Sequence, residues 1–282
     1  EYNSMIVRNQ HWKYSAPVYS AEYWEDNGYD DDVATYLSKR SRALKDFTEK
    51  MRRGEFPADY SDGNEKGIDL DWQGDPILDD DAIIRMIPHW EEFANALKQF
   101  SPAFGVLPDG CQTFFTLENI QLPGNVGRLL KDALMGKPFQ TLSFVNKAGV
   151  WANGAGMSID SILDIVNSNK HVQKLRIGNN FIGMDNIAKI CSAVRDGSIV
   201  DLDLYTCFEW NIFLGDKIIS SLLATGGLAK LKRFVFHSNG LQLRTIITLA
   251  NFLATNPPLQ TLGLVDNLLD NDDTETLAHA LR

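Results

Sequence analysis

The sequence predicts an α/β fold in which short parallel strands alternate with helices along most of the chain. Three observations predict it. A spacing of apolar residues suited to a short strand recurs at nearly regular intervals, an asparagine follows most copies of it, and helical apolar patterns lie between the copies. Self-similarity at a period of about 20 to 50 residues is the signature of a fold built from stacked repeats.

The clearest copy of the strand spacing is LQTLGLVDNLLDN at residues 259–271. Leucines occupy its first, fourth and sixth positions, and Asn267 occupies the ninth. The same spacing returns earlier in the chain. Its second apolar position is then Phe114, Leu142, Leu175, Leu202, Phe234 and Leu262. These residues lie 28, 33, 27, 32 and 28 positions apart, so we expect six units in register.

Helical spacing of apolar residues fills the intervals between these strands. It is clearest at residues 157–167, 184–195 and 243–255, and breaker residues at 226–227 and 256–258 follow two of the helices. One strand and one helix cannot bury their apolar faces alone, so the units must stack on each other. The sequence therefore predicts a shared core that contains the regularly spaced strand residues, with the residues between them facing outward.

The asparagine is expected at the point where the chain turns away from the strand. Its amide can pair with backbone groups that the turn leaves buried and without partners. Asn180, Asn239 and Asn267 occupy this position, and Cys207 is an accepted alternative to asparagine there. Lys147 is not, so we expect the unit that contains Lys147 to turn differently.

With apolar residues at Leu259, Leu262, Leu264 and Leu269 and a polar residue at Asn267, this pattern resembles the leucine-rich repeat. Units with a full helix are similar to its ribonuclease-inhibitor-like, intracellular type. The resemblance covers residues 111–282 and implies six leucine-rich repeats in a solenoid. This would be a curved horseshoe with a parallel sheet on its concave face and helices on its convex face. It implies no particular function, because one fold supports many.

The first 110 residues fit the pattern less well and predict a mostly helical N-terminal extension. Residues 67–110 are expected to form a degenerate capping repeat, whose helix begins at the aspartates 79–81 and is kinked or broken at Pro88. Residues 1–66 are expected to form an aromatic arm and a basic amphipathic helix at residues 33–53. The basic residues of this helix indicate either an anionic partner or a solvated face, and we favour the solvated face.

Composition argues against several classes of function. The chain has 282 residues and a formal net charge of −10, which disfavours nucleic-acid binding, and no apolar run is long enough to span a membrane. Cys111, Cys191 and Cys207 fall in mostly apolar surroundings, as expected of buried thiols in a reducing compartment. We therefore expect an intracellular, cytoplasmic protein, and a leader removed before Glu1 is compatible with the sequence.

No motif in the sequence indicates a catalytic, metal or cofactor site. The five histidines are scattered, and neither a His-Glu-x-x-His nor a Cys-x-x-Cys motif is present, so we predict no zinc site. NGAGMSI at residues 153–159 lacks the third glycine of a dinucleotide loop. The aspartates at positions 69, 71 and 75 lack the glycine and glutamate of a calcium loop. We therefore expect a protein without enzymatic activity, cofactor or metal.

The outward strand positions and two long loops are the predicted surface for a protein partner. Opposite charges on neighbouring strands either contact the partner or pair with each other. Insertions around Trp151 and Trp210 are expected on one side of the repeats, where their aromatic side chains either bind the partner or fold back on the core. The predicted partner-binding residues are Trp151, Lys174, Arg176, Asp201, Asp203, Tyr205, Phe208, Trp210, Arg233 and His237.

These expectations lead to a non-catalytic protein–protein interaction scaffold that binds through the concave sheet and the aromatic loops. The alternative is a regulator of an enzyme, of the GTPase-activating or inhibitor type, which the resemblance to ribonuclease inhibitor and Ran GTPase-activating protein favours. No residue can be matched to a catalytic or GTPase-contacting residue of those proteins. The last helix, at about residues 274–281, is expected to leave an apolar flank open for further chain or another protein.

Overall fold

The computed structural model describes residues 13–60, 64–101, 110–122, 124–147, 156–208, 212–241 and 243–281. Its strands are β1 (Ala58–Tyr60), β2 (Glu65–Asp71), β3 (Gln112–Ile120), β4 (Thr141–Asn146), β5 (Lys174–Gly178), β6 (Asp201–Tyr205), β7 (Arg233–His237) and β8 (Thr261–Gly263). Its helices are α2 (Ala21–Asp26), α3 (Asp31–Arg52), α4 (Asp80–Gln99), α5 (Gly124–Leu134), α6 (Ile159–Ser168), α7 (Met184–Asp196), α8 (Ile212–Ala224), η4 (Leu228–Lys230), α9 (Leu243–Leu253) and α10 (Asn271–Ala280).

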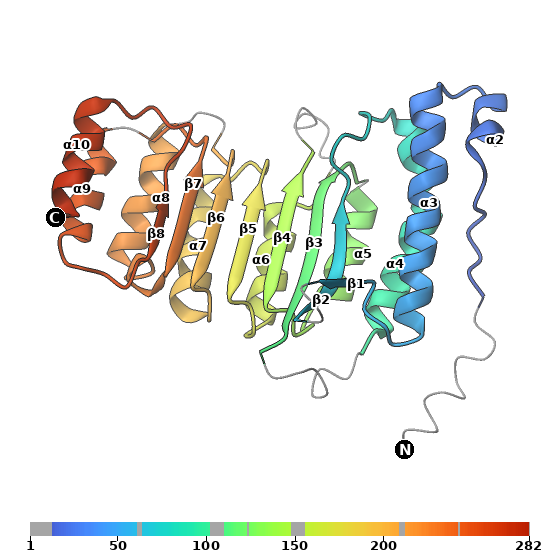
Figure 1. Ribbon diagram of the computed structural model, residues 1–282, viewed down its shortest axis with the longest axis horizontal. Coiled ribbons are helices and arrows are strands. Elements are labelled where there is room, and N and C mark those ends of the chain that lie inside the picture. The colour runs from blue at the N-terminus through green and yellow to red at the C-terminus, as the bar shows by residue number, and fades with distance from the viewer. Residues whose placement is uncertain are drawn as a thin grey trace, which may run out of the picture.

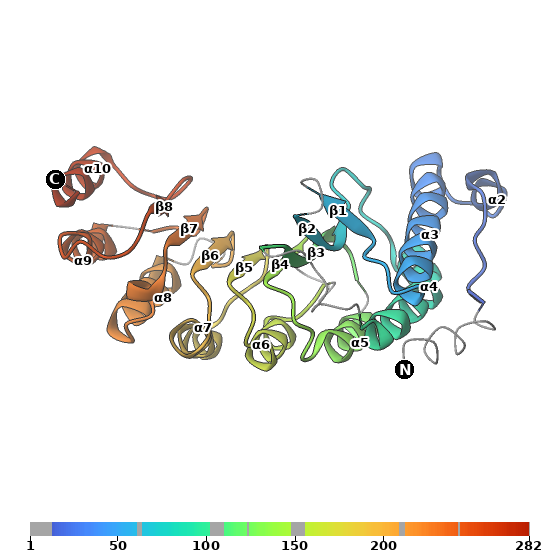
Figure 2. The same ribbon diagram turned by 60° about the horizontal axis from the view of Figure 1, so that its bottom comes forward.

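All described strands belong to one eight-stranded sheet, in which they follow their order in the sequence. β1 pairs with β2 in antiparallel orientation, and the pairs from β2 to β8 are parallel (Figure 1). Figure 2 shows α4 to α9 in a row along one face of the sheet, with α3 near one end and α10 near the other. This α/β architecture of repeated strands and helices is compatible with the predicted solenoid. We call the sheet face opposite the row of helices the open face.

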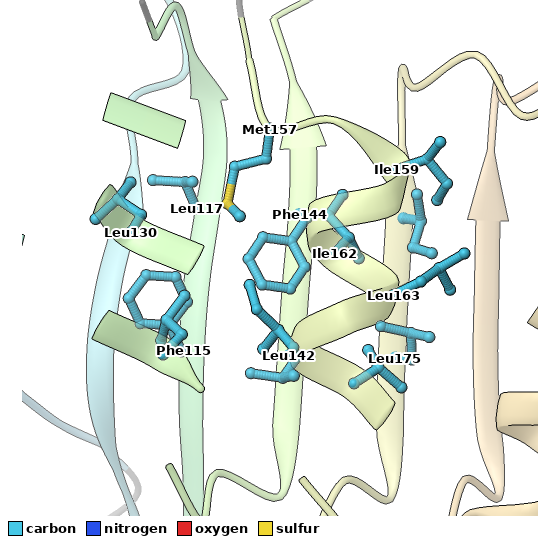
Figure 3. Packing of buried hydrophobic residues seen from close by; sticks show 14 of the residues in the cluster. Phe115, Leu117, Leu130, Leu142, Phe144, Met157, Ile159, Ile162, Leu163 and Leu175 are labelled. Carbon is cyan, nitrogen blue, oxygen red and sulfur yellow. The ribbon is translucent and has the colours of Figure 1, made fainter. Parts of the chain in front are cut away.

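The predicted apolar positions of β4 to β7 lie in register on the helix side of the sheet. Leu142, Leu175, Leu202 and Phe234 are in register with one another and are at most 2% exposed. Two residues later, Phe144, Ile177, Leu204 and Phe236 form a second buried row. Figure 3 shows side chains of the strands packed in one layer with those of α5 and α6. These helices therefore share the continuous core that the repeated spacing predicts.

The first predicted repeat was placed one residue away from its true register. Phe115 pairs with Leu142 and Leu117 with Phe144, whereas the spacing assigned the position of Leu142 to Phe114. Neighbouring strand residues point to opposite faces, so the shift places Phe115 in the core and Phe114 on the open face. The observed register buries the large apolar side chains of Phe115 and Leu117, whereas the predicted register would have buried Thr116.

The asparagines after the strands bond to the preceding unit, which confirms their predicted role. Asn239 is fully buried, donates from Nδ2 to the carbonyl of Leu204 at 2.8 Å, and accepts from the backbone N–H of Cys207 at 2.7 Å. Asn267 reaches back to β7 in the same way, through the carbonyl of Phe236 at 2.6 Å. Cys207, in an asparagine position, donates from Sγ to the carbonyl of Ile177 at 3.3 Å.

A left-handed backbone residue precedes most of these positions. These residues have φ between 47° and 58°; they are Asn119, Asn179, Thr206, Ser238 and Asp266. Asn146 occupies the corresponding position before Lys147 and does not have positive φ. Lys147 donates from Nζ to the carbonyl of Asp75 in the N-terminal part of the chain, not to the preceding strand. Lys147 therefore does not take the role of the turn asparagines, and the turn that follows it lies outside the described residues.

The N-terminal extension continues the layers of the repeats. β2 pairs with β3, Ile68 and Leu70 are fully buried, and α4 follows on the helix side, so residues 65–99 form a further strand–helix unit. α4 begins after its N-cap Asp79, as predicted, but Pro88 lies inside the helix and does not end it. An interior proline costs about 3 kcal/mol. Burial of Met86, Trp90, Phe93 and Leu97 offsets this cost, at about 2 kcal/mol for each side chain.

The basic helix α3 spans nearly the predicted residues and packs on α4. Several of its cations have partners within the chain. Arg40 makes a bidentate ion pair with Asp75 at 2.6 and 2.7 Å and lies over the ring of Trp72. Arg53 pairs with Glu55, and Lys50 donates to the carbonyl of Pro57. These contacts favour the solvated-face interpretation over an anionic partner.

At the other end of the sheet, α10 begins at Asn271, slightly before the predicted position, with a capping box between Asp270 and Asp273. It packs against α9, while Leu268 and Leu281 are 50% and 69% exposed. None of the helices that the structure describes combines the length and apolarity needed to cross a bilayer.

Candidate partner-binding surface

The open face brings seven of the ten predicted partner-binding residues together. In β5, β6 and β7, Lys174 is in register with Asp201 and Arg233, Arg176 with Asp203, and Gly178 with Tyr205 and His237. All seven predicted residues in these strands are partly or well exposed, and Tyr205 is 36% exposed. The predicted outward columns are therefore correct in the centre of the sheet.

The charged residues of this face pair with each other across strands. Arg176 Nη1 lies 3.2 Å from both carboxylate oxygens of Glu118 on β3, and its Nε lies 3.7 Å from Asp203. Arg233 Nη1 lies 2.9 Å from Asp201 and 4.0 Å from Asp203. We call these five residues the ion network. The sequence left two alternatives for these charges, contact with the partner or pairing with each other. The structure contains the pairing, and the partly exposed side chains still face outward.

The ion network orders side chains more than it stabilises the fold. Arg176 and Arg233 are 45% and 40% exposed, and ion pairs with such exposure contribute about 0 to 1 kcal/mol. Burial raises the pKa of Asp203, and the nearby charges of Arg176 and Arg233 oppose this rise. Ser143 donates to the buried carboxylate of Glu118, which fixes the β3 end of the network. The result is a defined pattern of charge in the middle of the open face.

Tyr205 occupies space that a glycine leaves beside it. A Cβ at Gly178 would lie 3.0 Å from the methyl groups of Val145 and 3.2 Å from Cδ1 of Tyr205. The valine and tyrosine side chains therefore close over the glycine backbone. This contact supports one side of the Tyr205 ring while the residue remains exposed to solvent.

Exposed apolar side chains follow the carboxyl ends of β5 and β6. Phe181 and Met184 are 52% and 55% exposed, and Phe213 is 78% exposed. Figure 1 shows that the segments after these two strands leave the same edge of the sheet. We call these three residues the rim. The sequence prediction named Trp151 and Trp210 near this edge; both lie outside the described residues.

The predicted insertion around Trp210 includes Phe213, although sequence reasoning did not name it among the partner-binding residues, and Phe181 and Met184 were missed. Met184 and Phe213 lie at the starts of helices, where an apolar residue is normally assigned to the core. Phe181 directly follows an asparagine of the repeat and precedes the buried Ile182. The signal available in the sequence was an apolar residue next to another apolar residue that already fills the core position, as Phe181 stands next to Ile182.

The prediction that Phe208 binds the partner is wrong, because this residue belongs to the core. Its side chain is fully buried, and its ring centroid lies 5.6 Å from that of Phe236. In other units the second residue after the asparagine position, Ile182 or Leu241, is buried. The corresponding residue in the β6 unit is Glu209, so Phe208 supplies the apolar side chain one position earlier.

Two of the cysteines are chemically protected. Burial raises the pKa of Cys191 to about 11 and of Cys207 to about 12, so both thiols stay protonated at neutral pH. All three cysteines are buried and free of disulfides. Among the residues with described positions, no group of three His, Cys, Asp or Glu residues is arranged to hold a metal ion.

Comparison with known proteins finds no family model that matches this chain and no curated protein that matches its sequence. The functional argument therefore depends on the geometry of the open face and the rim.

Proposed function

We propose that this chain is a leucine-rich repeat protein of the ribonuclease-inhibitor-like type, a curved horseshoe that acts as a non-catalytic protein–protein interaction scaffold. Its partner binds to the open face, which is the concave side of the horseshoe, and to the adjacent rim. One observation carries the proposal. Seven partly exposed polar, charged and aromatic side chains share a sheet face that has no row of helices over it, and three exposed apolar side chains follow the carboxyl ends of two of its strands.

The composition of this surface supports a protein as the partner. Exposed aromatic residues such as Tyr205, Phe181 and Phe213 are the kind that dominate binding energy at protein interfaces. The mixed charges of the ion network suit a specific protein surface better than the uniform charge of a nucleic-acid backbone. Buried cysteines that form no disulfide support an intracellular, cytoplasmic location.

Site-specific photocrosslinking tests the proposal. Tyr205 is replaced by p-benzoylphenylalanine in the full chain, which is then irradiated in native extract. The control carries the same substitution at Leu129 on α5, which is 37% exposed and lies on the helix side. We expect a discrete protein adduct at Tyr205 and none at Leu129. Adducts of equal yield at both positions, or at Leu129 alone, would refute binding at the open face.

The identity of the adduct separates the two forms of the function. A GTPase or a nuclease in the adduct, identified by mass spectrometry, selects the regulator of an enzyme. A protein without such activity selects the general scaffold. Turnover of a substrate by the purified chain would contradict the non-catalytic assignment.

A further inference from the structure

The β1–β3 end of the open face carries carboxylates whose hydrogen-bond donors are neutral. Asp69 accepts from the hydroxyl of Tyr60 at 2.8 Å, and Asp71 accepts from the side-chain amide of Asn119 at 2.8 Å. Neither carboxylate is in an ion pair found among the described residues: Lys66 on β2 pairs with Asp59 on β1, and the other ion pairs of the sheet involve Arg176 and Arg233. Both carboxylates are therefore held in place by donors that carry no charge.

Two aromatic rings lie beside these carboxylates. Tyr60 and Phe114 stack with centroids 5.7 Å apart and an angle of 14° between their planes. Phe114 lies across Gly67, where an added Cβ would be 2.7 Å from the ring and 2.1 Å from the Phe114 carbonyl. Tyr60 is 47% exposed and Phe114 is partly exposed. The aromatic surface is thus fixed by the missing side chain at position 67 and remains open to a ligand.

The spacing of these groups suits a long cationic side chain. Asp69 and Asp71 point to the same face of β2, about 7 Å apart. Phe114 pairs with Gly67, two residues before Asp69 on the same face. An arginine or lysine could lay its methylene groups on the rings and place its charge beside the carboxylates, because aromatic faces and carboxylates both attract cations.

The middle of the open face lacks this property. In β5 to β7 the carboxylates of Asp201 and Asp203 are matched by Arg233 and Arg176. The outward positions of β2 hold Asp69 and Asp71 and no cation. Lys174 and Arg176 reach Gln112 and Glu118 on β3, so the open face is electrically asymmetric, with its negative excess along β2 and nearly balanced charge from β5 to β7.

We propose that this end of the open face, formed by Tyr60, Asp69, Asp71 and Phe114 and here called the acidic end, receives a basic segment of the partner protein. The inference rests on the proposed function, because it assigns chemistry to one part of the same binding surface. Charge complementarity selects this occupant: the uncompensated carboxylates require cations, and the stacked rings favour cations carried on apolar stems.

Peptide binding to the full chain tests the inference. The probe is a fluorescein-labelled dodecapeptide of alternating glycine and arginine, titrated by fluorescence anisotropy at 50 and 200 mM NaCl. We expect D69N/D71N to raise Kd about tenfold at the lower salt and to reduce its salt dependence, because two charge contacts are lost. Phe114→Ala should raise Kd about threefold with unchanged salt dependence, because only the ring contact is lost.

A matched variant separates a site from a general effect of charge. D132N/D185N removes the same two charges from exposed positions on α5 and α7. We expect its Kd to stay within about twofold of the unmodified chain, because surface charges beyond a Debye length are screened. Equal losses in both double variants, or no loss in D69N/D71N, would overturn the inference. Asparagine can still accept from Tyr60 and Asn119, and circular dichroism confirms that each variant is folded.

The two proposals fail in distinguishable ways. If Tyr205 forms its adduct but the peptide does not distinguish D69N/D71N from D132N/D185N, the scaffold stands and the acidic end is not the basic-segment site. If the peptide distinguishes the variants but Tyr205 forms no specific adduct, the acidic end binds cations and the proposed partner surface is wrong.

Discussion

Polar groups find their hydrogen-bond partners in different ways in two regions of the molecule, the turns after β5 to β8 and the N-terminal end. At the turns, a side chain of one unit bonds to the backbone of the preceding unit, as Asn239 does with Leu204 and Cys207. The N-terminal end uses contacts that occur once. Arg40 pairs with Asp75, and Lys147 donates to the carbonyl of the same aspartate.

The difference shows which features of a repeat fold are local. A bond between equivalent positions of neighbouring units recurs whenever the spacing recurs, so one sequence pattern predicts all its copies. A contact such as that between Tyr14 and His89 joins residues 75 positions apart and has no second copy in the pattern. The two regions should therefore respond differently to single substitutions.

The largest expected effect is the loss of a turn asparagine. Asn239→Ala leaves the buried carbonyl of Leu204 and N–H of Cys207 without their partner, which should lower the free energy of unfolding by about 3 kcal/mol. Urea denaturation followed by circular dichroism measures this change. Asn251→Ala, on the exposed side of α9, is the control and should change stability by less than about 0.5 kcal/mol. Similar values for both variants would contradict the structural role of the turn.

Acidification should weaken the N-terminal end more than the turns. His89 is 3% exposed, its Nδ1 shares a hydrogen bond of 2.7 Å with the Tyr14 hydroxyl, and it hydrogen-bonds to the backbone of Pro17. Burial lowers the pKa of His89 to about 4, against 6.5 when unfolded. The unfolded chain therefore binds the proton first as the pH falls, and stability is lost between about pH 6.5 and pH 4.

The loss at His89 should reach about 2 to 3 kcal/mol at pH 4. This loss is measured by comparing the unfolding free energy of the unmodified chain with that of His89→Gln across this pH range. The difference between the two removes the contribution of the carboxylates, because both chains contain them. A difference that does not change with pH would show that His89 is not held neutral in the folded state.

A smaller loss of stability is expected when the contact between α3 and the loop before α4 is broken. Arg40→Met keeps an apolar stem beside Trp72 but leaves Asp75 without its cation, which should lower the free energy of unfolding by about 1 to 2 kcal/mol. Arg42→Met, at an exposed position of the same helix, is the control. We expect Arg42→Met to have no measurable effect in urea denaturation, and equal losses would assign the effect to helix α3 as a whole.

The smallest effect on stability is expected in the ion network. Arg176→Met should change the free energy of unfolding by less than about 1 kcal/mol, because the arginine is 45% exposed. It should nevertheless reduce the yield of the Tyr205 adduct, because the charge pattern beside Tyr205 changes. A large loss of stability with an unchanged adduct would reverse the roles assigned to the network and to the turns.

The sequence was sufficient for the parts of the fold that depend on spacing. The strands from β4 to β8, the buried rows and the turn asparagines follow from apolar residues at fixed offsets, because each unit has the same neighbours. Phe114 was misplaced because two adjacent phenylalanines fit the spacing equally well, and the burial of Leu117 decided between them. Pro88 does not break α4, because burial that the spacing does not measure exceeds the local cost of the proline.

The candidate site was predictable where it lies on strands and not where it lies beyond them. The outward residues of β5, β6 and β7 followed from alternation along each strand. Phe208 and Phe181 both follow the asparagine position of their units, yet one is buried and the other is exposed. Their difference depends on whether the next residue is apolar, as Ile182 is, or charged, as Glu209 is.

The backward direction of the turn bonds has a consequence for synthesis on the ribosome. In the turn after β6 the backbone N–H of Cys207 donates to the side chain of Asn239, and in the turn after β7 those of Asn239 and Leu241 donate to Asn267, in each case to the unit made next. A nascent chain thus carries one incomplete turn at its growing edge, and each new unit completes its predecessor. We therefore expect these units to assemble in the order of their synthesis, and a translational pause immediately before an asparagine to prolong the exposure of the edge behind it.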